Sequence, residues 1–226
     1  MMPSTRFELK IPVPYNRLEE INSWLSTHKY GFKDHHPDRW VNSLYLDLPN
    51  LACFEENLSG INNRKKVRIR WYNELENANN ATLEFKHRRS GKGYKVCFDT
   101  SMDIASKSCS WKKTLKQSYR ALPDKGKALW VSEHSPVLIC RYKRKYLVSK
   151  DDNIRATFDE SMHIYDQRYR DRVNINKSQS LGDYVLLELK CDDVYEKELG
   201  DLVSSCPLRP TRHSKYVNGV RYLTWV

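Results

Sequence analysis

The sequence predicts an α+β, mainly β fold in which an eight-stranded antiparallel β-sheet closes into a tunnel and helices pack on its outside. Three observations support this fold class. Short segments of alternating apolar and polar residues recur along the whole chain. Segments with helical spacing are fewer and lie between them. No internal repeat or Pro/Gly/Ser-rich linker divides the 226 residues, so residues 1–226 are expected to form a single domain.

Eight segments show the period-two alternation that is typical of strands with one buried face. Between the fourth and fifth of them, Gly91 and Gly93 can adopt positive φ, which predicts a hairpin loop and hence an antiparallel pair. The predicted strands are Arg6–Ile11, Trp40–Asp47, Lys66–Tyr72, Thr82–Arg88, Tyr94–Phe98, Val137–Leu147, Ile154–Phe158 and Tyr184–Lys190.

Four segments carry apolar residues at helical spacing and are predicted to cover the apolar side of the sheet. The second of them follows Asn50, a favourable N-cap residue, and is expected to end at Gly60. The apolar positions are Leu18, Ile21 and Leu25; Leu51, Phe54 and Leu58; Trp111, Leu115 and Tyr119; and Tyr195, Leu199, Leu202 and Val203.

The polar face of the predicted strands is strongly charged. If the apolar faces pack beneath the helices, the charged faces point toward one another around a wet interior. For any single strand, a solvated outer face is the alternative. Cations repeated at i and i+2 on several strands would repel one another without an anionic partner, so the pattern favours a polyanion or a polyphosphate group. These sets are Arg6, Glu8 and Lys10; Arg68 and Arg70; Glu84, Lys86 and Arg88; and Glu188 and Lys190.

Composition and motifs narrow the possible functions. The chain has 39 Lys and Arg against 28 Asp and Glu, a formal net charge of +11. No apolar run could span a bilayer and the start lacks the apolar core of a secretory signal, so a cytoplasmic protein is expected. The six cysteines form no CxxC pair, which favours reduced, mostly buried thiols over a zinc site. A Walker A loop and the GxGxxG, GxSxG and HExxH motifs are absent.

Two basic runs with interleaved aromatic residues, 64–66 and 141–146, leave single-stranded nucleic-acid binding as an alternative. Their cations lie within strand-like alternation, so half of them would face away from any one ligand. Nucleic acid is therefore the less favoured partner.

An ordered set of sequence blocks spans nearly the whole chain: Arg6–Lys10, Asn42–Asp47, Lys66–Tyr72, Leu83–Lys86, Tyr142–Arg144, Ile154–Asp159, Leu187–Lys190 and Ser214–Tyr216. Together with the RxRWY and LExK patterns inside them, these blocks resemble the VTC domain. That domain is the polyphosphate polymerase domain of the vacuolar transporter chaperone family, within the triphosphate tunnel metalloenzyme (CYTH-like) superfamily. The resemblance implies the triphosphate tunnel fold, with a basic lumen that binds nucleoside triphosphate and product.

The resemblance also implies roles for individual residues. Lys10 resembles the family's lysine near the transferred phosphate, and Glu188 the glutamate that holds a divalent metal, Mn²⁺ or Mg²⁺. Spacing alone would equally allow Glu188 to pair with a lysine. Where the family pattern has Lys before a Phe-Ser-Lys-like run, this chain has Arg212 and His213. The implied phosphate ligands are Arg68, Arg70, Lys86, Lys95, Arg144 and Arg155, with Tyr142 nearby, and Arg212, Ser214 and Lys215 near the C-terminus.

The reaction that these assignments predict is transfer of the γ-phosphate of ATP to a growing inorganic polyphosphate chain, with Lys10, Arg70 and Glu188 as catalytic residues. Arg6 stands where triphosphatases and CYTH cyclases have the first glutamate of ExExK. Loss of that carboxylate favours transfer over hydrolysis, because an acceptor phosphate oxygen is already ionised and needs no strong base.

Two alternatives remain open at this stage. One is an inorganic or nucleoside triphosphatase of the same tunnel fold. The other is a non-catalytic module that binds a polyanion or single-stranded nucleic acid. The expected partners are ATP and polyphosphate or pyrophosphate. Export of the product would require a separate membrane protein, which would place the protein at the inner face of a membrane.

Overall fold

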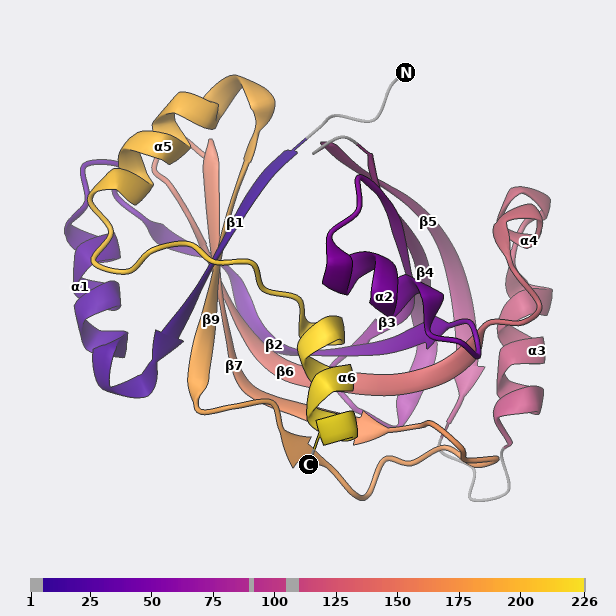
Figure 1. Ribbon diagram of the computed structural model, residues 1–226. Coiled ribbons are helices and arrows are strands. Elements are labelled where there is room, and N and C mark those ends of the chain that lie inside the picture. Colours follow the sequence, from indigo (N-terminus) through magenta and orange to yellow (C-terminus); the bar gives the residue numbers. More distant parts are fainter. Residues whose placement is uncertain (1–5, 90–91, 105–109, 226) are drawn as a thin grey trace. The chain divides into compact units, whose positions relative to one another are not determined.

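The computed structural model describes residues 6–89, 92–104 and 110–225 (Figure 1). The chain forms two compact units, and each is assembled from three separate stretches. Unit 1 comprises Met1–Arg39, Tyr142–Met162 and Gly182–Ser214, and unit 2 comprises Trp40–Arg141, His163–Leu181 and Lys215–Val226. Strands β2, β6 and β7 contribute residues to both units.

All eight predicted strands are present, and the sheet gains one short strand, β8. The strand order is β1-β9-β7-β6-β2-β3-β4-β5, with β8 paired to β7. Every pair whose register is described is antiparallel, including the predicted β4–β5 hairpin, although Ser90 and Gly91 lie outside the described residues. The strands are β1 (Arg6–Pro14), β2 (Lys33–Asp47), β3 (Asn63–Tyr72), β4 (Asn77–Arg89), β5 (Lys92–Asp103), β6 (Ser135–Val148), β7 (Ile154–Asp166), β8 (Gln179–Ser180) and β9 (Tyr184–Asp192).

In the described residues the sheet is not closed, unlike the predicted tunnel. In the described residues the strand order ends at β1 and at β5, and no pairing joins these two strands. Pro12 and Pro14 deprive β1 of two ladder donors, which suits an edge strand. The Lys10 carbonyl at that edge accepts a hydrogen bond from the Thr211 N–H (2.8 Å). A peripheral segment, rather than a closing strand, therefore satisfies this edge.

The β5 strand is likewise satisfied by a helix, α3 (Trp111–Ala121). Ser118 Oγ donates to the Ser101 carbonyl (3.1 Å), and Thr114 Oγ1 donates to the Asp103 carbonyl (3.2 Å). The Asp103 N–H donates to Gln117 Oε1 (3.1 Å). Side chains of α3 therefore form hydrogen bonds with backbone groups of β5 that a neighbouring strand would otherwise bind.

In unit 1, two predicted helices cover one face of β1, β7 and β9. They are α1 (Leu18–Thr27) and α5 (Glu196–Ser204), preceded by the 3₁₀ turns η1 (Tyr15–Arg17) and η2 (Asp193–Tyr195). Figure 1 shows both helices on the same side of β1 and β9. The shared core contains Ile11, Val13, Ile21, Leu25, Ala156, Phe158, Val185, Leu187, Leu189, Leu199 and Leu202.

In unit 2, the predicted α3 covers the apolar face of β3, β4 and β5, and the short α4 (Asp124–Leu129), which the sequence did not indicate, follows it (Figure 1). A second unpredicted helix, α6 (Lys215–Trp225), packs on the opposite face. Its Tyr216 ring stacks on Tyr45 (5.0 Å between centroids), the residue between the core positions Leu44 and Leu46. The core itself includes Leu44, Leu46, Val67, Ile69, Trp71, Leu83, Phe85, Met102, Trp111 and Ile139.

Asp47 fixes the start of the predicted helix α2 (Ala52–Ser59) from a distance. The N-cap is Leu51 and not the expected Asn50, although Asn50 Oδ1 accepts a hydrogen bond from the Ala52 N–H (3.2 Å); Gly60 ends the helix with φ of 74°, as expected. The next two amides, of Cys53 and Phe54, donate to the Asp47 carboxylate at 2.9 and 2.8 Å. Asp47 is completely buried and also accepts from the Tyr216 hydroxyl, so one carboxylate joins β2, α2 and α6.

Two further expectations concern the whole chain. No helix in the described ranges is long and apolar enough to cross a membrane. No disulfide forms among the five cysteines that the structure describes, while Cys109 lies outside the described residues.

Replacing Asp47 with Asn is expected to destabilise the protein by about 3 kcal/mol. The amide retains one acceptor oxygen, so buried donors of α2 or Tyr216 lose a charged partner. Urea unfolding of the variant measures this loss. Asp152→Asn, at an exposed carboxylate, is the control. A shift in Asp47→Asn no larger than in the control would show that Asp47 does not anchor α2.

Candidate phosphate-binding site

The strand register places cations directly opposite other cations. In unit 2, Lys66 lies opposite Lys86, which lies opposite Lys95, and Arg64 lies opposite Arg88. In unit 1, Arg155 of β7 lies opposite Lys190 of β9. Like charges at directly opposed positions of a sheet destabilise it. Anions stabilise such a face, so the charge distribution of both units is typical of an anion-binding surface.

In unit 2, a buried carboxylate gathers these cations. Glu84 of β4 lies opposite Arg68 of β3 and accepts a hydrogen bond from its Nε at 2.6 Å. Arg70 Nη1 and Lys95 Nζ lie 3.8 and 3.4 Å from Glu84 Oε1. Lys86 is two residues farther along the same face of β4, and the Tyr45 hydroxyl accepts a hydrogen bond from Arg68 (3.5 Å). We call this group the Glu84 cluster: Glu84, Arg68, Arg70, Lys86 and Lys95.

The surrounding cations keep Glu84 ionised. Burial alone would raise the pKa of its carboxyl, but Arg68, Arg70, Lys95 and Lys86 outweigh burial and hold this pKa well below its usual value. Glu84 therefore remains negative throughout the physiological range and holds two arginines in fixed positions. Arg68 uses Nε and Nη2 on Glu84, whereas Arg70 has only a longer contact with that carboxylate, so Arg70 is the better suited of the two to bidentate contact with phosphate oxygens.

In unit 1, Glu188 of β9 occupies a comparable position. It lies opposite Lys10 of β1 and accepts hydrogen bonds from Arg144 Nη2 (3.1 Å) and Lys190 Nζ (2.6 Å). Arg144 is also held by Asp159 of β7, with Nη2 2.6 Å from Oδ2, and lies over the Tyr142 ring at 5.2 Å. We call this group the Glu188 cluster: Glu188, Lys10, Arg144, Asp159 and Lys190.

Arg144 is fixed in its charged state. Burial would lower the pKa of its guanidinium, yet Asp159, Tyr142 and Glu188 raise this pKa well above the ordinary value. Arg144 is thus a permanent, buried cation whose orientation two carboxylates define. It can orient a phosphate oxygen but cannot donate a proton in a reaction.

Lys10 is positioned by residues far away in the sequence. Its ammonium lies 3.0 Å from Glu8 Oε1 and 3.9 Å from Glu188 Oε1, and it donates to the His213 carbonyl at 3.2 Å. His213 Nε2 is in turn hydrogen-bonded to the Tyr184 hydroxyl (2.7 Å). The contact between Tyr184 and His213 therefore anchors the backbone segment whose carbonyl orients Lys10.

Glu188 suits a divalent cation that is shared with a phosphate chain. Carboxylate oxygens are the hard ligands that Mg²⁺ and Mn²⁺ prefer, and Mg²⁺ commonly takes one or two carboxylates together with substrate phosphates. Within the described ranges, no three His, Cys, Asp or Glu residues are grouped to hold a metal between them. The residues fit a metal held jointly with phosphate and do not fit an all-protein cage.

Most of the predicted site residues lie in or beside the two clusters. The Glu188 cluster contains the predicted residues Lys10, Arg144 and Glu188, and Tyr142 and Arg155 lie beside it. The Glu84 cluster contains the predicted residues Arg68, Arg70, Lys86 and Lys95. Ser214 follows His213, and Lys215 is buried at the start of α6. Arg212 is exposed and makes no ion pair in the part of the chain that the structure describes, so it is not brought into the Glu188 cluster.

Contributing residues that were not predicted as site residues include Glu8, Glu84, Asp159, Lys190, Tyr184 and His213. Glu84 and Lys190 belong to the charged alternation, and pairing that alternation with a strand register would have identified them as counter-charges. Asp159 ends an expected strand block, where its contact with Arg144 has no local signal. Tyr184 and His213 are 29 positions apart, and no periodicity connects them.

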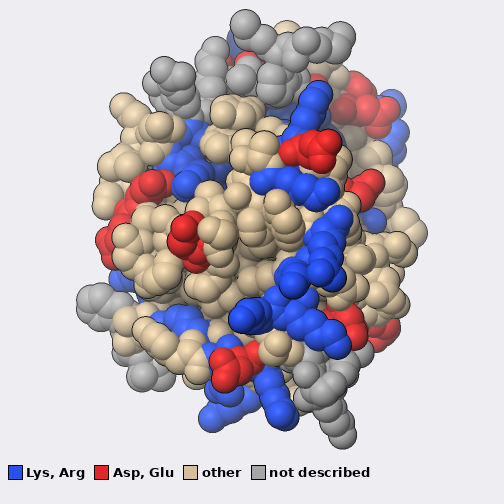
Figure 2. Space-filling model, turned by 90° about the vertical axis from the view of Figure 1, so that its right-hand side faces the viewer, with Lys and Arg blue, Asp and Glu red and all other residues tan. Residues whose placement is uncertain are grey.

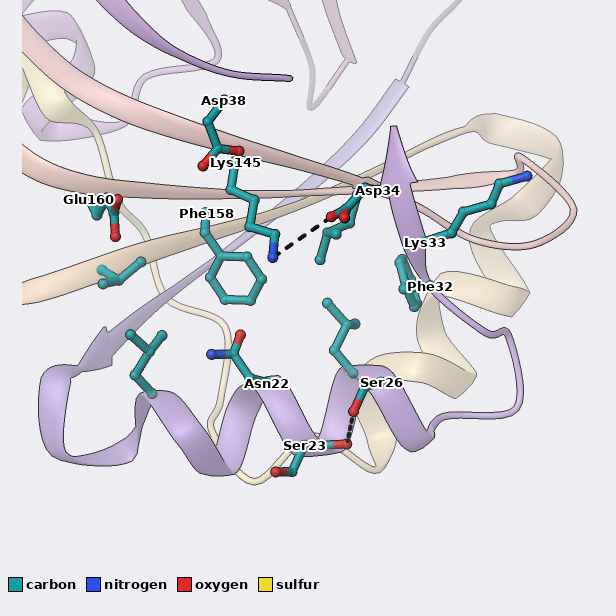
Figure 3. A pocket seen from close by; sticks show the side chains of 14 residues that line it. Asn22, Ser23, Ser26, Phe32, Lys33, Asp34, Asp38, Lys145, Phe158 and Glu160 are labelled. Atoms are coloured by element: carbon teal, nitrogen blue, oxygen red, sulfur yellow. Dashed lines mark hydrogen bonds and ion pairs between the residues drawn. The ribbon is translucent and has the colours of Figure 1, made fainter. Parts of the chain in front are cut away.

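Unit 1 also has a pocket of about 710 Å³ on a different face (Figure 3). It lies between α1 and parts of β2, β6 and β7, and Phe158 forms part of its lining, with Lys145 extending toward Asp34 (3.7 Å). Phe158 and Lys145 are sequence neighbours of Asp159 and Arg144 and so point to the opposite side of their strands. None of the predicted phosphate ligands lines this pocket.

The chain is similar to a known protein family in sequence and to solved structures in fold. The family model of the VTC domain matches residues 5–224. A candidate adenylate cyclase from Vibrio parahaemolyticus is 8% identical, with 96% of this chain and 98% of that chain covered and a TM-score of 0.53. A candidate adenylyl cyclase from Hippeastrum, described as having a dominant triphosphatase activity, is 15% identical, with 96% and 95% covered and a TM-score of 0.50. At these identities the solved structures show a shared fold. No curated protein sequence matches the chain.

Replacing Glu84 with Gln should destabilise the protein by about 3–5 kcal/mol at pH 7, because Arg68 then remains buried without its carboxylate. The folded-state pKa of Glu84 is depressed, so its stabilising effect is complete above the unfolded value of about 4.3 and is lost as pH falls. Urea unfolding at pH 7 and pH 3 should therefore show a smaller difference between wild type and variant at pH 3. Glu20→Gln, at a surface pair with Arg17, is the control and should have little effect. An equal difference at both pH values would contradict the assignment.

Replacing Tyr184 with Phe should weaken tripolyphosphate binding several-fold and lower stability by about 1 kcal/mol. The variant keeps the ring but loses the hydrogen bond to His213, which orients the carbonyl bonded to Lys10. Isothermal titration calorimetry and urea unfolding provide the two measurements. Tyr30→Phe, at a partly buried tyrosine packed against the core of unit 1, is the control. If Tyr184→Phe lost stability but bound tripolyphosphate normally, the contact would be structural only.

Proposed function

Because the chain belongs to the VTC domain family, with the fold of the triphosphate tunnel superfamily, we propose that it is a polyphosphate polymerase. In this proposal the γ-phosphate of ATP is transferred to a terminal phosphate oxygen of an inorganic polyphosphate chain. A bond forms between that oxygen and the γ-phosphorus, the bond to the β-phosphate oxygen breaks, and ADP leaves.

The observation that carries this proposal is the combination of surplus cations with engaged carboxylates. The register opposes Lys66 to Lys86, Lys86 to Lys95 and Arg155 to Lys190, which favours a chain of phosphates as the bound anion. The carboxylates on the same faces are already committed, since Glu84 and Glu188 both accept hydrogen bonds from arginines. A carboxylate held in this way is a poor base for activating water, whereas a phosphate acceptor needs no base at neutral pH.

The residues of the Glu84 cluster would bind and orient phosphate groups. Arg70 would supply planar donors for a bidentate contact, while Arg68, which is bonded to Glu84, would add a fixed positive charge and Lys86 and Lys95 mobile ones. In the transition state of phosphoryl transfer, negative charge spreads over the equatorial oxygens, and fixed cations stabilise it. Loss of one such donor is expected to cost about 2–4 kcal/mol of transition-state stabilisation. Arg70 is proposed as the most important donor of this cluster.

In the Glu188 cluster, Lys10 and Arg144 would contact the reacting phosphate group. Arg144 is locked between Asp159 and Glu188, so it defines a direction of approach, while Lys10 is held by Glu8 and the His213 carbonyl. The hydrogen bonds from Arg144 and Lys190 both reach Oε2 of Glu188, so Oε1 would hold Mn²⁺ or Mg²⁺ together with phosphate oxygens. When bound, such an ion neutralises phosphate charge as a Lewis acid.

A triphosphatase is the second candidate, because the Hippeastrum protein of the same fold is described as having that activity. The position of Arg6 favours transfer. Arg6 is half exposed and paired with Asp192 (3.1 Å), so this end of β1 offers an arginine where hydrolytic relatives are expected to have a carboxylate. A water molecule there would meet the Asp192 carboxylate, whose pairing with Arg6 makes it a poor base.

Purified protein incubated with ATP and Mn²⁺ is expected to form inorganic polyphosphate that is resolved as long chains on a gel, with ADP released in equal amount to the phosphate transferred. Arg70→Ala and Glu188→Ala should each reduce chain growth by at least a hundredfold, since each loses a group proposed to act on the transferred phosphate.

Arg17→Ala removes an arginine from a surface ion pair on the helix side of unit 1 and is the matched control, expected to match wild type. Circular dichroism verifies that the variants are folded. Release of orthophosphate without chain growth would identify a triphosphatase and refute the proposed polymerase. Wild-type chain lengths from Arg70→Ala and Glu188→Ala would refute the assigned residues.

A further inference from the structure

Helix α3 carries a row of basic side chains on its exposed face. Lys112, Lys116 and Arg120 recur at i, i+4 and i+8, and Lys113 lies beside the first. All four are exposed, and none forms an ion pair in the described part of the chain. Lys125 and Lys127 of α4 continue the positive charge, with Asp124 as the acidic residue of that helix. Figure 2 faces the side that carries α3 and α4 and shows a row of blue side chains across it.

This arrangement conflicts with the ordinary preferences of a helix. Lys112 and Lys113 occupy the first turn, where the helix dipole favours acids, and the first turn of α3 contains none. Lys112 and Lys116, and then Lys116 and Arg120, are like-charge pairs at i, i+4, which destabilise a helix. The Ser110 cap and the buried face hold α3 in place, but no ion pair in the described residues offsets its row of cations, and such a local conflict is expected at a functional surface.

We propose that the exposed face of α3, extended by α4, binds long inorganic polyphosphate outside the two clusters. The inference rests on the proposed function, which supplies this polymer as the product. Side chains four residues apart on a helix are spaced by about 6 Å along its axis, so the row presents regularly spaced cations to a linear chain of charges. Mobile lysine ammonium groups can pair with successive phosphates without a fixed register.

Other anionic surfaces fit this helix less well. The apolar side of α3 is buried, with Trp111 and Thr114 facing the core, so it cannot insert into a lipid bilayer as an amphipathic surface helix would. Tyr119 is exposed and packs edge-to-face on Trp130 (6.1 Å between ring centroids), but the other aromatic residue of α3, Trp111, is buried, so the helix lacks the row of exposed rings on which successive bases stack. A flexible polyanion without bases needs only the row of cations.

The test compares wild type with the triple variant Lys112→Gln, Lys116→Gln and Arg120→Gln. Fluorescently labelled long-chain polyphosphate should bind the variant at least tenfold more weakly at low salt. The slope of log affinity against log salt concentration should fall by about 2, as expected for three lost phosphate contacts. Binding of tripolyphosphate, too short to reach beyond a cluster, should change less than twofold.

The matched control is Lys150→Gln, Lys177→Gln and Lys197→Gln, which removes the same charge from exposed positions outside α3 and α4. It should bind long polyphosphate like wild type. If the two triple variants were equally weakened, net charge alone would account for binding, and the α3 surface would be refuted. Equal loss of tripolyphosphate and long-chain binding by the α3 variant would refute a separate surface. Single-stranded RNA bound as tightly as polyphosphate, and lost in parallel, would identify a nucleic-acid surface instead.

A second measurement does not depend on the variants. Long polyphosphate should protect Lys112 and Lys116 of the wild-type protein from chemical acetylation, while Lys197 stays reactive. Equal reactivity of all three lysines would overturn the proposal. The polymerase assay is separate from both measurements. Length-dependent binding without synthesis of polyphosphate from ATP would refute the proposed function but would support the α3 surface. Synthesis from ATP without protection of the α3 lysines would support the proposed function and refute the α3 surface.

Discussion

Pairing between buried carboxylates and cations is the interaction on which the polar faces of both units depend. Strands that oppose lysine to lysine and arginine to arginine would separate without counter-charges. Glu84 supplies this charge in unit 2 and Glu188 in unit 1, and each is nearly inaccessible to solvent. A buried charge is tolerated only when it is paired, so each glutamate and its arginine require one another. The faces are therefore held together while they retain a surplus of positive charge.

This internal pairing has consequences for ligand binding. A phosphate group that approaches Arg68 or Arg144 meets a cation already oriented, so little side-chain entropy is lost on binding. The same cation remains partly neutralised by its carboxylate, which limits the affinity for any one phosphate. A site that must bind a chain, let it move on and release it benefits from such moderate contacts repeated along its length, rather than from one very tight contact.

The sequence was informative where physical constraints are local. The alternation of apolar and charged residues identified all eight long strands, because each strand buries its apolar face and carries its charged residues on the opposite face. It did not identify α6, where Gly219 interrupts a helical pattern. A Cβ at that position would lie 2.8 Å from Leu138 Cδ2, so the glycine answers a packing requirement that no local pattern reveals. Closure was wrongly expected for the same reason, since α3 side chains and the Thr211 amide satisfy the sheet edges through tertiary contacts.

The same difference between local patterns and tertiary contacts applies to the candidate site. Its cations were predictable, because each lies on the polar face of an alternating strand, but their roles came from a resemblance and their partners from the register. Glu84 illustrates the difference: as one charge in an alternating strand it has no assigned purpose, and only opposite Arg68 does it become the counter-ion of a cluster. In the proposed function, a carboxylate committed to an arginine holds the cation that would bind phosphate and is withheld from activating water, so the pairing that stabilises the polar face would also disfavour hydrolysis.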